Sequence, residues 1–242
     1  DGIGLGRESL GGKGIVDALI QGPLMRDLIN ADYLVDYKIY CPPSDFSREG
    51  IAIGADGEFT KAGVKTATQK SHVLGDVVKH YIDIAYGLKG ITFASDIEDA
   101  EDIAARFRAA GVPAQAVSSK TSTTDRIKYL QQFECGQLLQ LVNVDLFGEG
   151  YDVPDLEVVS FARPTASFQT YLQQFGRVLR TCVERGKKFG IVIDHVGNVL
   201  AHGLPDAYRE QTLASRPRSS SSKTDPDVMP TTTCLNPLCF RV

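Results

Sequence analysis

The chain has 242 residues, of which 43% are hydrophobic and 23% are charged. This composition is typical of a globular protein, and the length allows one large domain or one domain with appendages. The formal net charge of −4 argues against a basic protein that coats nucleic acid without specificity. A protein of this charge can still make local contacts to a nucleic-acid backbone.

Cysteine usage and hydrophobic runs indicate the compartment. The five cysteines are scattered along the chain and do not form the framework of a small disulfide-rich secreted protein. No run of 18 apolar residues is present, so the sequence predicts no transmembrane helix and no membrane partner. We therefore expect a cytoplasmic protein.

The first predicted elements are a short helix over residues 23–33 and a strand over residues 37–41, which stops at the double proline 42–43. The double proline is a candidate domain boundary. Residues 44–68 are polar and predict a linker with a short exposed helix. The apolar spacing in residues 70–88 predicts a longer helix.

From residue 90 onward, strands and helices alternate. Strands are predicted over residues 90–94, 114–117, 137–142, 158–161 and 188–194, and helices over residues 96–110, 123–133 and 167–182. Asp96 is the expected N-cap of the first of these helices, and Gly111 is its expected terminating glycine. The alternation predicts an α/β fold with a parallel sheet that has helices on both faces. Such sheets bind ligands beyond the carboxyl ends of their strands, and we expect the functional motifs there.

Two arginines, Arg177 and Arg180, stand three residues apart in the last predicted helix. On a helix this spacing would place both guanidinium groups on one face. Paired guanidinium groups can contact a γ-phosphate and stabilise the charge that develops during phosphoryl transfer. The arginines alone are equally compatible with a solvated helix face.

The frame Gln-x-x-Gly-Arg-x-x-Arg of residues 173–180 resembles motif VI of the superfamily 2 helicases. Residues 149–154, Glu-Gly-Tyr-Asp-Val-Pro, resemble motif V of the same family about 20 residues upstream. The resemblance covers residues 1–205 and is weakest over residues 44–88. It implies a helicase C-terminal domain, the second RecA-like domain of a P-loop NTPase of the DEAD/DEAH type, from a bacterium or a phage.

The resemblance also implies roles for single residues. Arg177 and Arg180 would be arginine fingers, and Gln173 would contact the nucleotide or couple it to domain closure. In the motif V stretch, a glycine permits a close approach of the backbone, and an aspartate suits a hydroxyl of the ATP ribose. The predicted nucleotide-binding residues are Glu149, Gly150 and Asp152.

A second set of residues resembles the nucleic-acid contacts of the family. Ser95 ends a strand that resembles motif IV, and Ser119 and Lys120 follow the next predicted strand. Asp145 would lie on the loop that couples the nucleotide to nucleic acid. Hydroxyls and amides at such junctions can bind phosphate. The alternative is that Ser122 caps the following helix while the other hydroxyls face water.

The N-terminal stretch Gly11-Gly12-Lys13-Gly14 resembles the end of a Walker A loop but lacks its frame. Arg7 stands where that loop needs a glycine, and Gly14 stands where it needs serine or threonine. No Walker B run is present either. We therefore expect a first RecA-like domain to hold Mg²⁺ and the phosphates of ATP, and we expect this chain alone to be inactive.

We expect three regions. Residues 1–42 would be the trailing part of the first RecA-like domain and the crossover, residues 43–213 the C-terminal RecA-like domain, and residues 214–242 a flexible linker with the start of a candidate zinc-binding module. Cys234 and Cys239 would be half of a zinc site in a longer parent protein, or two thiols without a metal. Both termini suggest a piece of a longer protein.

The predicted function is the C-terminal motor domain of an ATP-dependent superfamily 2 DNA helicase or translocase. Its expected partners are the first RecA-like domain and DNA or RNA, single-stranded or at a duplex junction. One alternative is a translocase subunit of a restriction or repair complex, which an attached nuclease domain would reveal. The other is a non-catalytic RecA-like scaffold that binds nucleic acid, which loss of the two arginines would have favoured.

Overall fold

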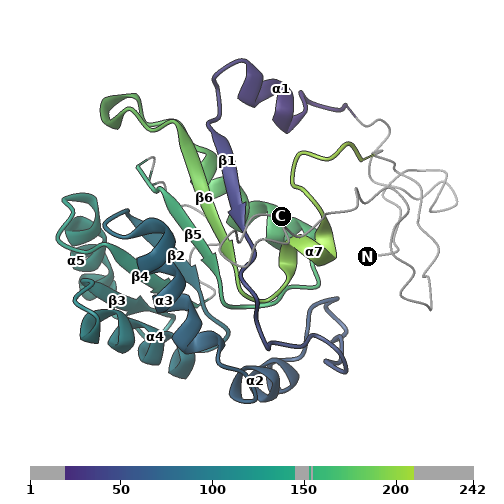
Figure 1. Cartoon of the computed structure of the whole chain (residues 1–242), viewed down its shortest axis with the longest axis vertical. Coiled ribbons are helices and arrows are strands. Elements are labelled where there is room, and N and C mark those ends of the chain that lie inside the picture. Colours follow the sequence, from purple (N-terminus) through teal and green to yellow (C-terminus); the bar gives the residue numbers. More distant parts are fainter. Residues whose placement is uncertain (1–19, 145–152, 154, 210–242) are drawn as a thin grey trace, which may run out of the picture.

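The computed structural model describes residues 20–144, 153 and 155–209, and it places six strands in one sheet (Figure 1). The strands are β1 (Asp36–Tyr40), β2 (Gly90–Phe93), β3 (Ala114–Val117), β4 (Gln140–Asn143), β5 (Val158–Phe161) and β6 (Phe189–Asp194). Their order is β1-β6-β5-β2-β4-β3, and every neighbouring pair is parallel. The predicted parallel α/β sheet is confirmed.

Helices cover both faces of the sheet. They are α1 (Met25–Asn30), α2 (Lys61–Gln69), α3 (Val73–Ala85), α4 (Ile97–Ala109), α5 (Thr123–Glu134), α6 (Phe168–Gly176) and α7 (Asn198–His202). Right-handed crossovers place α3 and α4 on one face, because both lead the chain in the same direction across the sheet. Helices α5 and α6 lead it in the opposite direction and therefore lie on the other face.

The core lies on the central strands. Every residue of β2, β4 and β5 is buried, as expected for strands with a helix on each face. Helix α4 shows how the sequence sets the element. The carboxylate of Asp96 accepts a hydrogen bond from the Asp99 amide at 2.9 Å, and Gly111 follows the helix with a φ of 79°. Both predicted signals are confirmed.

Strand β1 lies on the N-terminal side of the boundary that the double proline predicts. Its residues Asp36–Tyr40 pair with Phe189–Ile193 of β6, so they belong to the same sheet as the rest of the domain. The sheet therefore begins before Pro42, which differs from a boundary placed between residues 42 and 43. The physical reason is that the prolines follow the strand and end its ladder without separating it from the sheet.

The last predicted helix is shorter than expected, and the prediction that Arg177 and Arg180 share one helical face is wrong. Helix α6 ends at Gly176, and a 3-10 turn, η1 (Arg177–Leu179), follows it. Arg180 is already extended, with φ −63° and ψ 137°. The two arginines therefore do not stand on one helical face, because the helix ends before the first of them.

The predicted linker over residues 44–68 is partly structured. Ile53 and Phe59 form an isolated antiparallel bridge, and α2 follows. Helix α2 is not wholly exposed, because Val64 and Thr68 are buried at 5% and 1% exposure. The segment connects β1 to α2, and its side chains reach the loops that follow β5 and β6.

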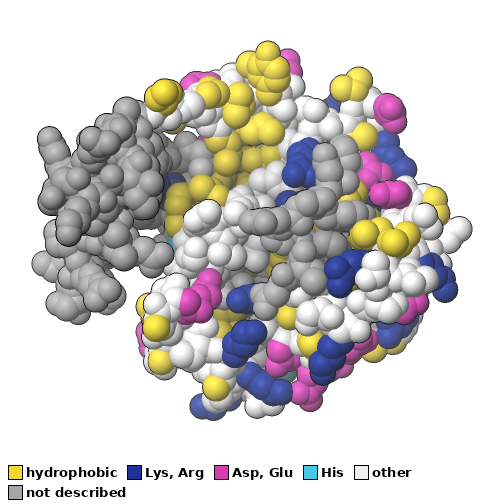
Figure 2. Space-filling view, turned by 180° about the vertical axis from the view of Figure 1, so that it is seen from behind, with side chains coloured by type: hydrophobic (Ala, Val, Ile, Leu, Met, Phe, Trp, Pro, Cys, Tyr) yellow, Lys and Arg dark blue, Asp and Glu magenta, His cyan; other side chains and the backbone are white. Residues whose placement is uncertain are grey.

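The described surface has mixed charge. Figure 2 shows Lys and Arg side chains interspersed with Asp and Glu over the described part of one face. This pattern agrees with the small negative net charge and argues against a broad basic coat. Within residues 20–144 and 155–209, no helix is long and apolar enough to cross a membrane.

Candidate nucleotide and nucleic-acid sites

The motif VI segment lies at the amino-terminal edge of the sheet, which corrects the expectation that all motifs gather beyond the carboxyl ends. Helix α6 starts after β5 and runs back along the sheet, so its end returns to the edge where the strands begin. There the Val35 amide donates a hydrogen bond to the Leu179 carbonyl at 2.8 Å, and Leu34 bridges Arg180. Both contacts involve residues that directly precede β1. The backbone of η1 is thereby fixed to the sheet.

The arginines differ in exposure. Arg177 is 8% exposed, whereas Arg180 is half-buried at the start of the extended segment. Gln173 is exposed on α6, one turn before η1. The structure thus brings Arg177 and Arg180 to one edge with Gln173 nearby. The other predicted nucleotide residues, Glu149, Gly150 and Asp152, lie outside the described residues.

Asp155, the residue after the motif V stretch, lies at the same edge. Its carboxylate pairs with the ammonium group of Lys89 at 2.6 Å, just before β2. The Lys89 side chain is 3% exposed and also donates to the Glu134 carbonyl at the end of α5. The buried ammonium group of Lys89 therefore holds the chain before β2 next to the chain before β5. The sequence analysis missed this ion pair, although a lysine next to a buried strand is a signal that could have suggested it.

A second lysine supports the backbone after η1. The ammonium group of Lys187 donates to the Arg180 carbonyl at 2.8 Å, and burial lowers the pKa of Lys187 to about 8. Arg185, in the 3-10 turn η2 (Val183–Arg185), pairs with Asp155 at 3.3 Å. The chain after motif VI is thereby connected to the chain after motif V.

The predicted nucleic-acid residues gather at the opposite, carboxyl-terminal edge. Ser95, Ser119 and Lys120 line one surface hollow of about 480 Å³ beyond the ends of β2, β3 and β4. Helix α2 adds Lys61 and Lys65, which the sequence analysis missed because no local pattern places that helix at this edge. Asp145 lies outside the described residues, directly after Val144 of the same hollow.

The hollow has acidic residues beside its lysines. Glu98 pairs with Lys65 at 2.6 Å, and Asp96 lies 3.7 Å from the same ammonium group. Lys120 is exposed. The hollow therefore presents a few separate cations and hydroxyls, which suits local phosphate contacts better than a continuous basic groove.

In the loop between β3 and α5, the hydroxyls of Ser118, Thr121 and Ser122 make local hydrogen bonds. Ser122 caps α5, since its hydroxyl accepts a hydrogen bond from the Asp125 amide at 3.1 Å. The Thr121 hydroxyl accepts from the Ser118 amide at 3.0 Å, and the Ser118 hydroxyl accepts from the Lys120 amide at 3.2 Å. These local bonds shape the loop and leave Ser119 and Lys120 at the surface.

Side chains from the segment after β1 hold the loop that leads into α6. The Glu58 carboxylate accepts from the Thr165 hydroxyl and from the Ala166 amide, each at 2.5 Å. Arg48 donates to the Thr165 carbonyl at 2.7 Å and to the Gly197 carbonyl at 2.8 Å. The predicted linker therefore fixes the start of the motif VI helix, which is a role that polarity alone could not reveal.

Metal ligands are scarce in the described ranges. No group of three or more His, Cys, Asp or Glu side chains in those ranges could hold a metal ion. Cys234 and Cys239, the residues of the predicted half zinc site, lie outside them. His195, which follows β6, is buried, and burial beside His80 lowers its pKa to about 3. A neutral, enclosed imidazole agrees with a structural role.

Comparisons with known proteins agree with this architecture. The fold matches "The fragment structure of a putative HsdR subunit of a type I restriction enzyme from Vibrio vulnificus YJ016", with a TM-score of 0.59 and 19% identity over 81% of this chain and 38% of that one. A 51.5 kDa protein of Lactococcus phage (isolate 7-9) is 37% identical over 201 residues, which are 83% of this chain and 43% of the relative. The ATP-dependent RNA helicase SrmB of Haemophilus influenzae is 26% identical over 141 residues, 58% of this chain and 31% of the relative.

The family model of the helicase conserved C-terminal domain matches residues 70–182. Residues 70–182 are thus similar to the C-terminal domain of superfamily 2 helicase-type proteins. Relatives in this family are ATP-dependent helicase-type enzymes. The chain spans less than half the length of each relative named above.

Proposed function

We propose that this chain supplies the C-terminal motor domain of an ATP-dependent superfamily 2 DNA helicase or translocase. ATP would bind in a cleft between a first RecA-like domain and the amino-terminal edge of this sheet. Domain closure would bring Arg177 and Arg180 to the γ-phosphate, and hydrolysis would release the closure. Alternating closure and release would move the protein along a strand.

The observation that carries the proposal is the backbone fixation of the motif VI segment. Leu179 and Arg180 are bonded to residues that precede β1, and the Lys187 side chain supports the Arg180 carbonyl. An arginine finger needs a fixed backbone, because it acts on charge that develops at one position in the transition state. Two guanidinium groups also suit the chemistry of phosphate oxygens, which accept paired N–H donors.

The remaining parts of the nucleotide site are proposed from the family pattern. Gln173 would contact the nucleotide or sense closure, and Asp152, with Glu149 and Gly150, would hold the ribose side. Mg²⁺, when bound to the β- and γ-phosphates, neutralises their charge, and its ligands would come from the first RecA-like domain. The hollow of Ser95, Ser119 and Lys120, together with Asp145, would form part of the nucleic-acid track.

Arginine substitutions in the full-length protein test the proposal. Arg177→Ala or Arg180→Ala should lower ATP turnover by about 10³-fold and change ATP binding little, because a finger meets its charge in the transition state. Arg177→Lys should not restore turnover, since a point charge does not reproduce the planar fork. Asp152→Ala should instead raise the KM for ATP, because a ribose contact is similar in ground and transition states.

A nearby arginine provides the control. Arg185→Ala removes a guanidinium whose side chain is 53% exposed and which pairs with Asp155 at 3.3 Å. It should keep turnover within a few-fold of wild type, since exposed ion pairs contribute about 0–1 kcal/mol. Normal turnover in both Arg177→Ala and Arg180→Ala would contradict the proposal and favour the non-catalytic scaffold.

A further inference from the structure

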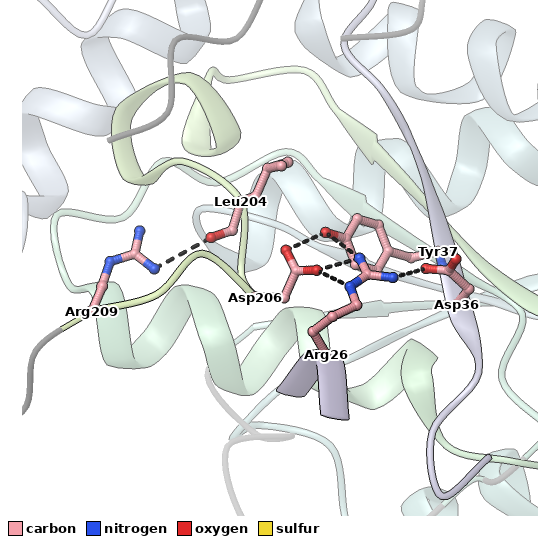
Figure 3. A network of polar contacts seen from close by, with 6 residues as sticks. All are labelled: Arg26, Asp36, Tyr37, Leu204, Asp206 and Arg209. Atoms are coloured by element: carbon pink, nitrogen blue, oxygen red, sulfur yellow. Dashed lines mark hydrogen bonds and ion pairs between the residues drawn. The ribbon is translucent and has the colours of Figure 1, made fainter. Parts of the chain in front are cut away.

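Two segments far apart in sequence meet beside the motif VI helix (Figure 3). The Asp206 carboxylate accepts a hydrogen bond from Arg26 Nε at 2.6 Å on one oxygen and from the Tyr37 hydroxyl at 2.6 Å on the other. Arg26 comes from α1, Tyr37 from β1, and Asp206 from the chain after α7. The Asp206 side chain is only 9% exposed, so its bonds form away from bulk water. We name these three residues the Asp206 cluster.

Tyr37 connects the Asp206 cluster to α6. Its ring meets the ring of Phe175 edge to face, with centroids 5.1 Å apart and planes at 87°. Phe175 is fully buried and lies two residues before Arg177. Burial and the bond to Asp206 raise the pKa of Tyr37, so its hydroxyl stays protonated and remains a donor. The rigid Tyr37 ring therefore links Asp206 to Phe175 at the end of α6.

The chain around Asp206 touches α6 at further points. The Tyr171 hydroxyl donates to the Gly203 carbonyl at 3.0 Å, and the Arg209 guanidinium lies 3.9 Å from the centre of the Phe168 ring. Together with the contact between Tyr37 and Phe175, these contacts follow one side of α6 from its first turn to its last. The segment 203–209 therefore supports the whole motif VI helix.

The segment that contains Tyr37 also contacts η1 through its backbone. Val35 donates to the Leu179 carbonyl at 2.8 Å, and Leu34 bridges Arg180. Residues 34–37 thus contact motif VI before and after Arg177, by a side chain on α6 and by the backbone beyond it. A shift of Tyr37 cannot leave both of these contacts in place.

We propose that Arg26, Tyr37 and Asp206 are positioning residues for the motif VI arginines. This inference rests on the proposed function, in which Arg177 and Arg180 act on ATP. Catalytic geometry is sensitive to small displacements, and a shift of about 1 Å can lower a rate about 10²-fold. The Asp206 cluster ties the chain that precedes β1 and the chain that follows α7 to α6, the helix that ends directly before Arg177.

The test measures ATP turnover and ATP binding of the full-length protein at a temperature where each variant is folded. Asp206→Ala and Tyr37→Leu should each lower kcat by roughly tenfold or more and leave the KM for ATP within about twofold. Tyr37→Phe keeps the ring against Phe175 and loses only the hydroxyl, so it should lose less activity than Tyr37→Leu. A purely structural role would lower the melting temperature and leave the kcat of the folded protein unchanged.

Two further variants keep the inference falsifiable. Arg26→Ala removes a side chain that is 41% exposed, and it should fold and still lower kcat. Asp36→Ala removes the other carboxylate near Arg26, which is 58% exposed and lies 3.1 Å from the guanidinium, and it should behave like wild type. If Arg177→Ala abolishes turnover while Arg26→Ala, Tyr37→Leu and Asp206→Ala keep a normal kcat, the positioning role is wrong. If Arg177→Ala itself keeps normal turnover, the proposed function fails and the positioning role fails with it.

Discussion

The residues proposed to contact the nucleotide and those proposed to contact nucleic acid lie at opposite edges of the sheet. The described arginines of motif VI lie where the strands begin, whereas Ser95, Ser119 and Lys120 lie where the strands end. In the proposed function, a nucleotide and a nucleic-acid strand would therefore contact this domain from opposite edges. Lys120 is an exposed cation of the second edge, and its role can be measured independently of ATP.

At this scale we predict a loss of nucleic-acid affinity for Lys120→Ala in the full-length protein. A lysine that contacts one phosphate should weaken binding about equally for all sequences and lower the salt-dependence slope by about 0.7–1, because fewer counterions are released. Titration of labelled single-stranded DNA at several salt concentrations measures both quantities, and a matching RNA strand separates DNA from RNA. The control is Lys128→Ala, an exposed lysine on α5 that does not line the hollow. Equal affinities for Lys120→Ala and Lys128→Ala would show that Lys120 does not contact the nucleic acid.

At the scale of elements, the sequence predicted the parallel sheet and the central βαβ units, because hydrophobic runs and caps are local. The side chains of Asp96, Ser122 and Ser167 each accept the hydrogen bond from a backbone amide that is typical of an N-cap. The end of α6 was not predictable in the same way. Arg180 leaves the helix to bridge Leu34, a residue far away in sequence, so a tertiary contact overrides the helical pattern.

The site was predictable in its residue types more than in its placement. The Gln-x-x-Gly-Arg-x-x-Arg frame led to the motif VI prediction, but the edge of the sheet on which Arg177 and Arg180 lie depends on the direction in which α6 runs. Lys61, Lys65 and Glu58 reach their sites from residues 44–68, which the sequence predicts as a linker with a short exposed helix. Such contacts join elements that no local window contains, so sequence pattern alone could not supply them.

The packing of η1 against β6 gives a prediction at the same scale. A Cβ at Gly190 would lie 2.5 Å from the Val178 carbonyl oxygen and 2.8 Å from both methyl groups of Val178. Because a backbone atom blocks the site, Gly190→Ala should push η1 away from β6 and destabilise the domain by about 1–3 kcal/mol. Urea unfolding of this chain measures the change.

The matched control for Gly190 is Gly75→Ala in α3. A Cβ there meets only an Arg106 guanidinium nitrogen, at an ordinary contact distance of 3.7 Å. Alanine in a helix should stabilise the protein by up to about 1 kcal/mol relative to glycine. Equal unfolding midpoints for Gly190→Ala and wild type would show that η1 can move without cost, which would argue against a fixed backbone at the motif VI segment.

At the scale of the whole molecule, the proposed function gives this chain one side of a nucleotide site. The stretch around Lys13 does not have the Walker A frame, and the sequence has no Walker B run. The β- and γ-phosphates and Mg²⁺ would thus be held by another domain, and finger arginines act only on phosphates that are already in place. The family's ATP-dependent activity therefore should not be a property of this chain by itself.

We accordingly predict that the purified 242-residue chain does not turn over ATP, with or without single-stranded DNA. A phosphate-release assay measures this, and the full-length protein under the same conditions shows that the assay detects turnover. Because contaminating ATPases can give a background rate, the decisive comparison is with the Arg177→Ala form of the same chain. DNA-stimulated turnover that Arg177→Ala abolishes would show that the chain holds a complete site. In that case the phosphate-binding residues would have to lie within these 242 residues, and the two-domain arrangement proposed for the cleft would be wrong.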